Sequence, residues 1–224
     1  MLYTKEAVRD NIRNRDGKRV FYLGKGDQLT SDAKDYLTAQ RIAILPASEA
    51  RPERYRLLCG GYMEEKPETM THLNGDVLVP KTHPRIALRG AVDTLEAELL
   101  LCAAEATGGI RAQLEEALTF ARTLLRHEVL DEPVKDVLLG GMDAAALRTR
   151  SHRPQDFYGK PHFMPVPEDL KLLLLINRAR CAARAAELQA VAAFPEGRED
   201  LIMGFNRLSS FLYLIMIQLK SAKE

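Results

Sequence analysis

Residues 172–194, LLLLINRARCAARAAELQAVAAF, decide the fold. The stretch is rich in leucine and alanine, contains neither glycine nor proline, and is long enough for about six turns of helix. This composition predicts a long helix in the core of the molecule. The helix also carries Arg178, Arg180 and Arg184. Guanidinium groups beside so many apolar side chains need a partner of opposite charge.

The polar side chains of this helix follow one stripe. On a helical wheel the stripe is about 80° wide, and it contains Asn177, Arg180, Arg184 and Glu187. Like charges one turn apart destabilise an isolated helix by a few tenths of a kcal/mol, so Arg180 and Arg184 need an anion between them. Glu187 can pair with one of the two, but hardly with both. The alternative is that the stripe simply faces solvent, as in many amphipathic helices.

The last apolar segment of the chain favours a site over a solvated stripe. In GFNRLSSFLYLIMIQL, residues 204–219, one helical face is shared by Asn206, Ser210, Tyr213 and Ile217, and bulky apolar residues occupy most of the remainder. An Asn-Arg pair inside so apolar a helix resembles a binding site more than a surface.

Two such helices, if they are antiparallel neighbours, bring four polar side chains together in the bundle: Arg180, Arg184, Glu187 and Asn206. Guanidinium groups bind phosphate oxygens through two parallel hydrogen bonds, so a pair of arginines suits a polyphosphate. The sequence therefore predicts an anion site between these helices.

The composition limits the class of protein. With 224 residues and 46% hydrophobic side chains, the chain can form a substantial core. Thirty-two basic and 31 acidic residues give a net charge of +1, which indicates neither nucleic-acid binding nor attachment to an acidic membrane. Widely spaced Cys59, Cys102 and Cys181, and an N-terminus without an apolar signal core, predict a cytoplasmic protein. The apolar run Phe211–Leu219 is about half of the roughly 20 residues of a membrane helix and is expected to be core.

The pattern of apolar residues predicts a mainly α fold, an antiparallel bundle of about five helices with a small N-terminal α/β extension. Predicted helices cover 84–109, closed by Gly108 and Gly109, then 110–130, 168–194 and 199–221, with one broken or two short helices in 132–152 that restart at Asp143. Residues 153–169, rich in proline and aromatic side chains, form a long irregular connection, and such loops are often functional.

The first part of the chain has a different pattern of residues, one that predicts strands as well as a helix. Residues 18–46 predict a strand, a turn at Gly24–Asp27, a helix capped by Thr30 or Ser31, and a second strand that ends at Pro46. Residues 47–68 are predicted to be a linker or a mobile loop. We therefore expect an N-terminal α/β extension and linker in residues 1–68 and a helical bundle in residues 69–224.

Several motifs together resemble one protein family. RARCAARAAELQAV (178–191) and FNRLSSFLYLIM (205–216) resemble the two C-terminal helices of the ATP-dependent cobalamin adenosyltransferases, which carry Arg-x3-Arg-x2-Glu and then Asn-Arg-Leu-Ser. VPKTHPRIALRGAVDTLEAEL (79–99) resembles the family's Lys-x2-Pro-Arg segment at the start of the first bundle helix. Each motif is weak alone, but their order and spacing together are specific.

Other segments are similar to the ethanolamine-utilisation branch of this family. They are KPETMTHL (66–73), DEPV (131–134), LRTRSH (147–152) and the N-terminal unit LTSDAKDYLTAQRIAI (29–44). The resemblance thus covers nearly the whole chain.

The resemblance implies a helical-bundle enzyme, a homo-oligomer that binds ATP at a subunit interface and holds a corrinoid nearby. Cob(I)alamin attacks the 5′ carbon of ATP, which gives adenosylcobalamin and triphosphate, and Mg²⁺ usually accompanies the nucleotide. The corrinoid carries the difficult chemistry, and the protein supplies position and charge neutralisation. The product would serve a B12-dependent lyase or dehydratase. The resemblance to the ethanolamine-utilisation branch also implies that the protein could associate with a bacterial microcompartment. No nucleic-acid or membrane partner is expected.

The resemblance also implies roles for individual residues. Arg180 and Arg184 match the family arginines that hold the triphosphate, and we expect them to be the catalytic pair. Glu187 matches the acid that orders the arginines, and Asn206 matches the asparagine near the nucleotide. Lys81 matches the lysine that enters the first bundle helix, where it would contact a phosphate.

The sequence departs from the family in two places. Relatives of another branch carry a Thr-Gly-Asp phosphate loop; TMTHL stands at this position here, and we hypothesise that Thr69, Thr71 and His72 form part of the nucleotide loop. Many ethanolamine-branch relatives carry a histidine followed by Cys-Cys-x2-Cys just before this point. This chain has only Cys59 there and no histidine nearby upstream. Because a structural metal site generally needs three or four ligands, no metal is predicted.

Two alternatives remain open at this point. Phe157, Tyr158 and Phe163 in the long loop could cover the corrinoid and keep its lower axial position dry, or they could be packing residues of a lid. The chain itself could be a transferase, or a non-catalytic helical module that binds ATP or a corrinoid or docks onto a metabolic microcompartment. The absent cysteine motif favours the module. The arginine pair favours the transferase, because a scaffold has little use for a desolvated cationic stripe.

Overall fold

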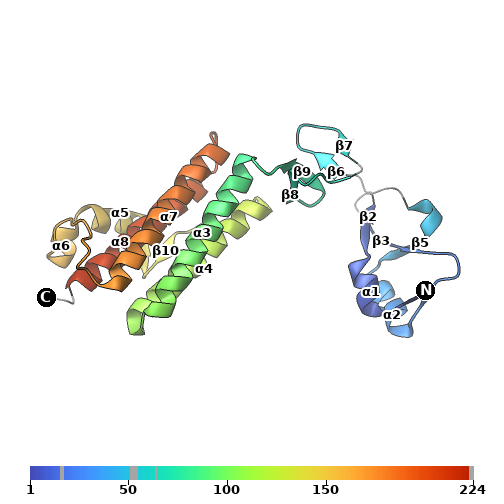
Figure 1. Ribbon diagram of the computed structural model, residues 1–224, viewed down its shortest axis with the longest axis horizontal. Helices are drawn as coiled ribbons and strands as arrows, with labels where there is room; N and C mark the ends of the chain where they lie inside the picture. The colour runs from blue at the N-terminus through green and yellow to red at the C-terminus, as the bar shows by residue number, and fades with distance from the viewer. Residues whose placement is uncertain (16–17, 51–54, 64, 222–224) are drawn as a thin grey trace. The chain divides into compact units, whose positions relative to one another are not determined.

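The structure is a computed structural model that describes residues 1–15, 18–50, 55–63 and 65–221. The chain forms two compact units, Met1–Arg54 and Tyr55–Glu224, and the helical bundle lies in the second (Figure 1). The predicted fold class, a helical bundle with a small N-terminal α/β extension, is confirmed.

The first unit is built around a parallel strand pair. Strand β3 (Lys18–Leu23) pairs with β5 (Ala43–Pro46), and the two are connected through helix α2 (Ser31–Ala39). Thr30 caps this helix, because its hydroxyl accepts a hydrogen bond of 3.3 Å from the backbone N–H of Ala33. The strand, helix and strand predicted for residues 18–46 are therefore confirmed.

Short elements that the sequence did not predict complete this unit. They are β1 (Leu2–Tyr3), which is parallel to β4 (Gln28–Leu29), helix α1 (Lys5–Asp10), β2 (Arg13–Arg15), which is antiparallel to β3, and the 3₁₀ helix η1 (Ala47–Glu49). Their small core contains Val8, Phe21 and Leu37, which are at most 1% exposed. Segments of two or three residues are too short to show a periodic pattern.

The second unit begins with a four-stranded sheet of order β7-β6-β9-β8. Its strands are β6 (Tyr55–Leu57), β7 (Tyr62–Met63), β8 (Met70–Asn74) and β9 (Val77–Pro80). Residues 55–57 and 62–63, which lie in the stretch predicted to be a linker or mobile loop, thus form strands. The sequence reasoning missed them because β6 is stabilised by a parallel partner, β9, that lies about 20 residues further along the chain.

Four long helices form the bundle, with two short helices beside them (Figure 1). They are α3 (Pro84–Glu105), α4 (Gly108–Leu130), α5 (Ala144–His152), α6 (Pro154–Tyr158), α7 (Lys171–Ala193) and α8 (Glu199–Ser221). Helix α3 runs antiparallel to α7, and two ion pairs join them. Glu98 accepts from Arg178 at 2.6 Å, and Glu105 accepts from Lys171 at 3.0 Å.

Helix α7 packs into the bundle through small side chains. Its buried face contains Leu173 and Ile176, followed by Ala179, Ala183, Ala186 and Ala190. These four alanines are fully buried and recur every three or four residues, the spacing of one helical face. Small side chains let neighbouring helices approach closely, so α7 is packed between α3 and α8.

Helix α8 is the most apolar helix of the bundle. By length and composition, it is the one helix among the described residues that could cross a membrane, but 56% of its most apolar window is buried inside the protein. Its core side chains include Phe205, Leu208, Phe211 and Ile215, which are at most 1% exposed. The apolar run at Phe211–Leu219 is therefore part of the core, as predicted.

The segment before α5 differs from the prediction. Residues 132–141 were expected to be helical, but they contain β10 (Leu138–Leu139), which turns through Gly140 and Gly141 into β11 (Met142–Asp143). Both glycines have positive φ, 59° and 71°, the conformation that a two-residue hairpin turn requires. Asp143 caps α5 as predicted, because its Oδ1 accepts a 2.7 Å hydrogen bond from the N–H of Ala146.

The turn between the first two bundle helices also differs in detail. Helix α3 ends at Glu105, and its cap is Ala106 rather than a glycine. Gly108, expected to close this helix, instead begins α4 with a φ of 55°. A glycine tolerates this conformation at no steric cost, so it can start a helix after a sharp reversal.

A buried carboxylate joins the sheet to the bundle. Glu128 of α4 is 1% exposed and accepts hydrogen bonds from the guanidinium groups of Arg85 and Arg89 on α3. Arg89 also donates a 2.8 Å hydrogen bond to the carbonyl oxygen of Leu73 in β8. Because a buried charge is stable only when it is paired, this cluster fixes β8 against the start of α3.

The packing of α8 against α4 can be tested by substitution of Gly204. A methyl group at this position would lie 2.6 Å from Cδ2 of the buried Leu124, so Gly204→Ala is expected to lower the free energy of unfolding by about 1–3 kcal/mol. Gly90 in α3 is the matched control, since no atom lies within 4 Å of a methyl group there. Gly90→Ala should be neutral or stabilising by up to about 1 kcal/mol. Urea denaturation measures both, and equal effects at the two sites would contradict this packing.

Candidate active site

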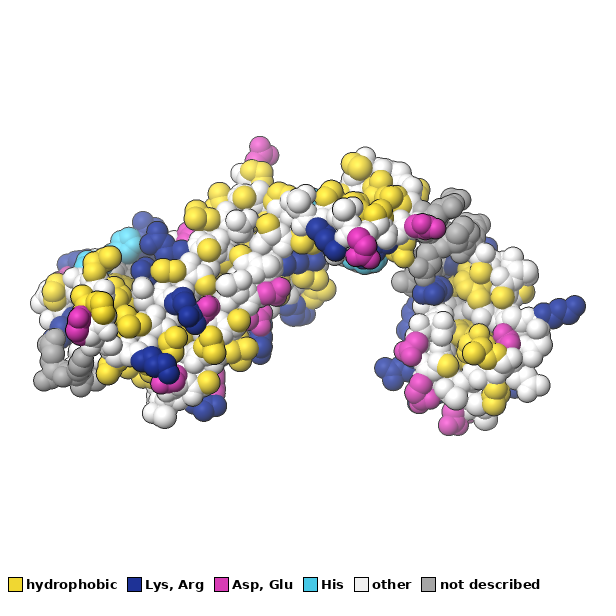
Figure 2. Space-filling view, in the orientation of Figure 1, with side chains coloured by type: hydrophobic (Ala, Val, Ile, Leu, Met, Phe, Trp, Pro, Cys, Tyr) yellow, Lys and Arg dark blue, Asp and Glu magenta, His cyan; other side chains and the backbone are white. Residues whose placement is uncertain are grey.

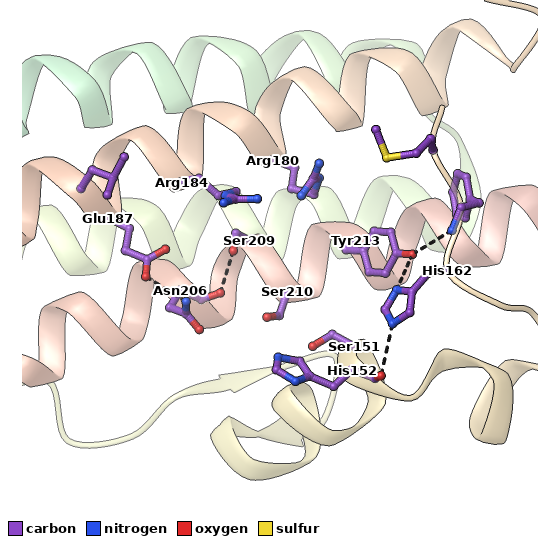
Figure 3. A pocket seen from close by; sticks show the side chains of 13 residues that line it. Ser151, His152, His162, Arg180, Arg184, Glu187, Asn206, Ser209, Ser210 and Tyr213 are labelled. Atoms are coloured by element: carbon purple, nitrogen blue, oxygen red, sulfur yellow. Dashed lines mark hydrogen bonds between the residues drawn. The ribbon is translucent and has the colours of Figure 1, made fainter. Parts of the chain in front are cut away.

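A pocket of about 700 Å³ opens between α7, α8, α5 and the loop that follows α6 (Figure 3). The four residues that the sequence placed in one anion site all line it: Arg180, Arg184, Glu187 and Asn206. Ser210 and Tyr213, predicted to share a helical face with Asn206, line it too. The fourth residue of that face, Ile217, is instead fully buried in the core.

The two arginines lie in the wall of this pocket, and neither has a carboxylate partner among the described residues. Arg180 is half-buried and donates hydrogen bonds of 3.3 Å and 3.1 Å, from Nε and Nη2, to Oδ1 of Asn177. Its guanidinium carbon lies 5.9 Å from the centre of the Tyr213 ring. Arg184 is exposed. Within the part of the chain that the structure describes, neither guanidinium forms an ion pair.

The exposure of Arg184 corrects one expectation. The two arginines were expected to form a desolvated stripe inside the bundle, but Arg180 is only half-buried and Arg184 is exposed. The alanine face of α7 fills the core, so the arginines, on another side of the helix, reach an open pocket.

The third arginine of the stretch has a different environment. Nε of Arg178 donates a 2.6 Å hydrogen bond to Glu98 on α3. Its side chain therefore faces a neighbouring helix, and a carboxylate neutralises its charge. Arg178 thus differs from Arg180 and Arg184, for which no ion pair is found among the described residues.

Glu187 and Asn206 contact each other directly. Nδ2 of Asn206 donates a 2.8 Å hydrogen bond to Oε1 of Glu187, so α7 and α8 are joined at this end of the pocket (Figure 3). Glu187 was expected to pair with an arginine of its own helix. Among the described residues it forms no ion pair with Arg180 or Arg184, because its carboxylate faces α8 instead.

Tyr213 is a further pocket residue, which was not predicted to belong to the site. Its hydroxyl lies 3.0 Å from Nδ1 of His162 and accepts a 3.4 Å hydrogen bond from the N–H of Phe163. Nε2 of His162 lies 3.2 Å from the carbonyl oxygen of His152 in α5. These contacts hold the proline-rich loop against the pocket (Figure 3). The only signal in the sequence was the shared helical face of Tyr213 and Asn206.

The three loop aromatics occupy different environments. Phe163 lines the pocket, and its ring stacks on Tyr213 with the centres 5.9 Å apart. Tyr158 packs against the core of the bundle. Phe157 is 46% exposed and lies beneath the guanidinium of Arg150. Of the three, only Phe163 reaches the pocket, where Met164 of the same loop joins it.

The other predicted nucleotide residues do not line this pocket. Thr71 and His72 belong to β8, and Nδ1 of His72 lies 3.1 Å from the carbonyl oxygen of Gly75. Thr69 immediately precedes this strand. Lys81, which directly follows β9, is exposed, and its Nζ lies 3.8 Å from Oε2 of Glu68. Figure 1 shows β8 and β9 beside the start of α3, away from α5 and α6.

No metal centre is formed by the residues that the structure describes. Among them, no three histidine, cysteine or acidic side chains are grouped as ligands. Cys59 and Cys181 are exposed, and Cys102 is buried in α3.

Comparison with known proteins identifies the family. The family model for cobalamin adenosyltransferase matches residues 61–219, so the chain belongs to the cobalamin adenosyltransferase family. It is 28% identical over 242 residues to the corrinoid adenosyltransferase EutT of Salmonella typhimurium, with 96% of this chain and 90% of the relative covered. It is 27% identical over 216 residues to EutT of Escherichia coli K12, with coverages of 94% and 80%. The resemblance to the ethanolamine-utilisation branch is thereby confirmed.

Solved structures support the fold. A variant of a PduO-type ATP:corrinoid adenosyltransferase from Lactobacillus reuteri, complexed with cobalamin and ATP, matches with a TM-score of 0.53 and 16% identity, over 76% of this chain and 91% of the other. A second variant of that type, complexed with ATP, matches with a TM-score of 0.52 and 19% identity, over 70% and 92%. Because the sequence identities are this low, these two matches establish a common fold alone.

The role of Tyr213 in holding the loop can be tested. Tyr213→Phe keeps the ring but removes the hydroxyl that contacts His162 and Phe163, so we expect faster amide hydrogen exchange in residues 160–166. The free energy of unfolding should fall by about 1 kcal/mol. Tyr62→Phe, at a ring that is 66% exposed, is the control. Unchanged exchange in the loop of Tyr213→Phe would show that the hydroxyl does not hold it.

Proposed function

We propose that this chain is an ATP:corrinoid adenosyltransferase, which transfers the 5′-deoxyadenosyl group of ATP to cob(I)alamin and releases adenosylcobalamin and triphosphate. The observation that carries the proposal is the pair of guanidinium groups, Arg180 and Arg184, on one pocket without a carboxylate partner among the described residues. Membership of the family supports the reaction. The EutT relatives are named corrinoid adenosyltransferases, and a structural neighbour was solved with cobalamin and ATP.

The chemistry explains why unpaired cations are useful here. The lone pair of cobalt(I) forms a bond to the 5′ carbon of ATP, and the bond from that carbon to the phosphate oxygen breaks with its electrons. Negative charge therefore accumulates on the departing triphosphate. Arg180 and Arg184 would bind its oxygens through charge-assisted hydrogen bonds that strengthen as the charge develops. An arginine already neutralised by a protein carboxylate would contribute less.

The remaining polar residues position the nucleotide in this proposal. Asn206 would lie beside the nucleotide, and Glu187 would hold Asn206 through the hydrogen bond between them. Glu187 is the one carboxylate among the described residues that line the pocket. This suits Mg²⁺, which keeps several waters and is commonly bound by one or two carboxylates together with substrate phosphates.

The corrinoid would lie against the apolar side of the pocket. Phe163 and Met164 supply apolar surface there, and Phe163 is held in place by its contacts with Tyr213. An apolar surface beneath the ring would exclude water from the lower axial position of cobalt. The same role for Phe157 and Tyr158, which lie outside the pocket lining, remains a prediction.

We further propose that the site is shared between copies of the chain in a homo-oligomer. The predicted phosphate ligands form two groups within the second unit: Arg180 and Arg184 on the pocket, and Lys81 with the Thr69–His72 segment on the sheet. A second copy could bring the two groups together. Apolar side chains beside the pocket favour such a contact, because Leu188 is 69% exposed and Met203 is 40% exposed. Figure 2 shows apolar side chains spread over the surface of the bundle.

The remaining parts of the proposal rest on the family. We place catalysis in residues 69–224 and regard residues 1–68 as an extension. The protein would act in the cytoplasm, where association with a bacterial microcompartment would bring it close to a B12-dependent lyase or dehydratase that uses its product.

Substitution of the arginines tests the proposed function. Arg180→Ala should lower kcat/KM for ATP by about 100-fold or more, because it removes a charge-assisted contact to the leaving group. Arg184→Ala should lower it by about tenfold, since the exposed group is more strongly screened by water. The measurement is spectrophotometric conversion of cob(I)alamin with ATP and Mg²⁺ under reducing conditions.

Arg178→Ala is the matched control on the same helix. It breaks a partly exposed ion pair with Glu98, which typically contributes at most about 1 kcal/mol, so activity should be retained. An active Arg180→Ala variant would remove Arg180 from the proposed role. A wild-type protein that binds ATP without transferring the adenosyl group would instead be a non-catalytic binding module.

The shared site predicts complementation between inactive subunits. Lys81→Ala and Arg180→Ala would each disable every site of their own homo-oligomer. Mixed oligomers from co-expression would contain some sites with both native residues, so partial activity should return. Activity no higher than the sum of the two separate variants would show that the site is not shared in this way.

A further inference from the structure

Arg207 lies next to Asn206 but belongs to a different part of the surface. It lines a second hollow of about 390 Å³, together with Arg148 and Glu199, and it is absent from the described lining of the larger pocket. The two hollows share His152, Glu187 and Asn206. Arg207 is therefore separated from the proposed triphosphate site by the side chains of that shared wall.

The guanidinium of Arg207 is held in an unfavourable environment. Its Nε is buried and has no hydrogen-bond partner within the described chain, and no carboxylate among the described residues forms an ion pair with it. Burial, with a smaller contribution from the charge of Arg148, lowers the pKa of Arg207 below its usual value. A cation in such a position does not stabilise the fold efficiently, so its presence calls for another reason.

Among the described residues, Arg207 forms one side-chain hydrogen bond, to Asn206. Nη1 of Arg207 donates a hydrogen bond to Oδ1 of Asn206, while Nδ2 of Asn206 donates to Glu187 at 2.8 Å. A guanidinium can only donate hydrogen bonds, and a carboxylate can only accept them. The amide of Asn206 thus lies between a cation at its oxygen and an anion at its nitrogen. Rotation of the amide by 180° would lose both hydrogen bonds and create two repulsive contacts.

We propose that Arg207 is a positioning residue for the nucleotide site, because it fixes the orientation of the Asn206 amide from the side opposite Glu187. This inference rests on the proposed function, in which Asn206 lies beside the nucleotide. The orientation decides which amide atom Asn206 presents to ATP. One N–H and one lone pair of the amide remain available for a ligand, and each keeps a fixed place only while both protein contacts hold.

The inference requires Arg207 to act through Asn206. A double-mutant cycle measures this directly, because two residues that act through one contact show non-additive effects. The cycle consists of wild type, Arg207→Met, Asn206→Ala and the double variant. Two quantities are measured for each protein: the Kd for ATP by calorimetry, and kcat/KM for ATP in the adenosyl-transfer assay.

We expect Arg207→Met to weaken ATP binding and to lower kcat/KM by about tenfold, mainly through KM, with the cobalamin dependence unchanged. In the Asn206→Ala background the same substitution should change either quantity by less than about twofold. Arg207→Lys keeps a cationic donor and should recover most of the loss. The matched control is Arg126→Met. Arg126 is an exposed arginine of α4 that pairs with Glu132, so its replacement should leave both quantities unchanged.

The outcomes separate this inference from the proposed function. Equal effects of Arg207→Met in the presence and absence of Asn206 overturn the positioning role, and so does a variant with unchanged ATP binding. If Arg207→Met does not fold, judged by circular dichroism, Arg207→Gln takes its place in the cycle. If the wild type binds ATP without transferring the adenosyl group, the proposed function fails, and the cycle is decided on Kd alone. A wild type that does not bind ATP overturns both.

Discussion

The structure depends on the close packing of α7 between α3 and α8. This packing is possible because one face of α7 carries four buried alanines, whose small side chains let the neighbouring helices approach closely: Ala179, Ala183, Ala186 and Ala190. Because that face is committed to the core, the arginines on another side of the same helix must reach the surface of the bundle. The packing that stabilises the fold also sets Arg180 and Arg184 on one wall of a pocket and places Asn206 of α8 across from them.

Charge pairing with carboxylates divides the arginines of the bundle into two groups. Arg178 is paired with Glu98, Arg85 and Arg89 share the buried Glu128, and Arg198 pairs with Asp131 at 3.3 Å. Each of these cations joins two segments of the bundle. The arginines of the pocket make no such pair with the described residues, so their charge remains available to a ligand. An anion between them would also relieve the repulsion between two like charges one helical turn apart.

The sequence predicted the features that are encoded locally, and it missed those that depend on distant partners. The long helices, the caps at Thr30 and Asp143 and the polar stripe of α7 follow from helical spacing and capping chemistry. The hairpin at Leu138–Asp143 was mistaken for helix, because its leucines resemble a helical pattern and its glycines alone reveal the turn. The contact between Tyr213 of α8 and the proline-rich loop could not be predicted, because its partner His162 lies 51 residues away in the sequence. The outward position of Arg184 depends on how α7 packs, which one sequence segment cannot show.

We propose that the guanidinium groups of Arg180 and Arg184, which have no carboxylate partner among the described residues, bind the triphosphate of ATP. A crystal structure of this protein with ATP and Mg²⁺ tests it most directly. We expect phosphate oxygens within hydrogen-bond distance of both guanidinium groups, in the pocket between α7 and α8. A triphosphate bound elsewhere, with no phosphate oxygen in contact with either arginine, would contradict this proposal.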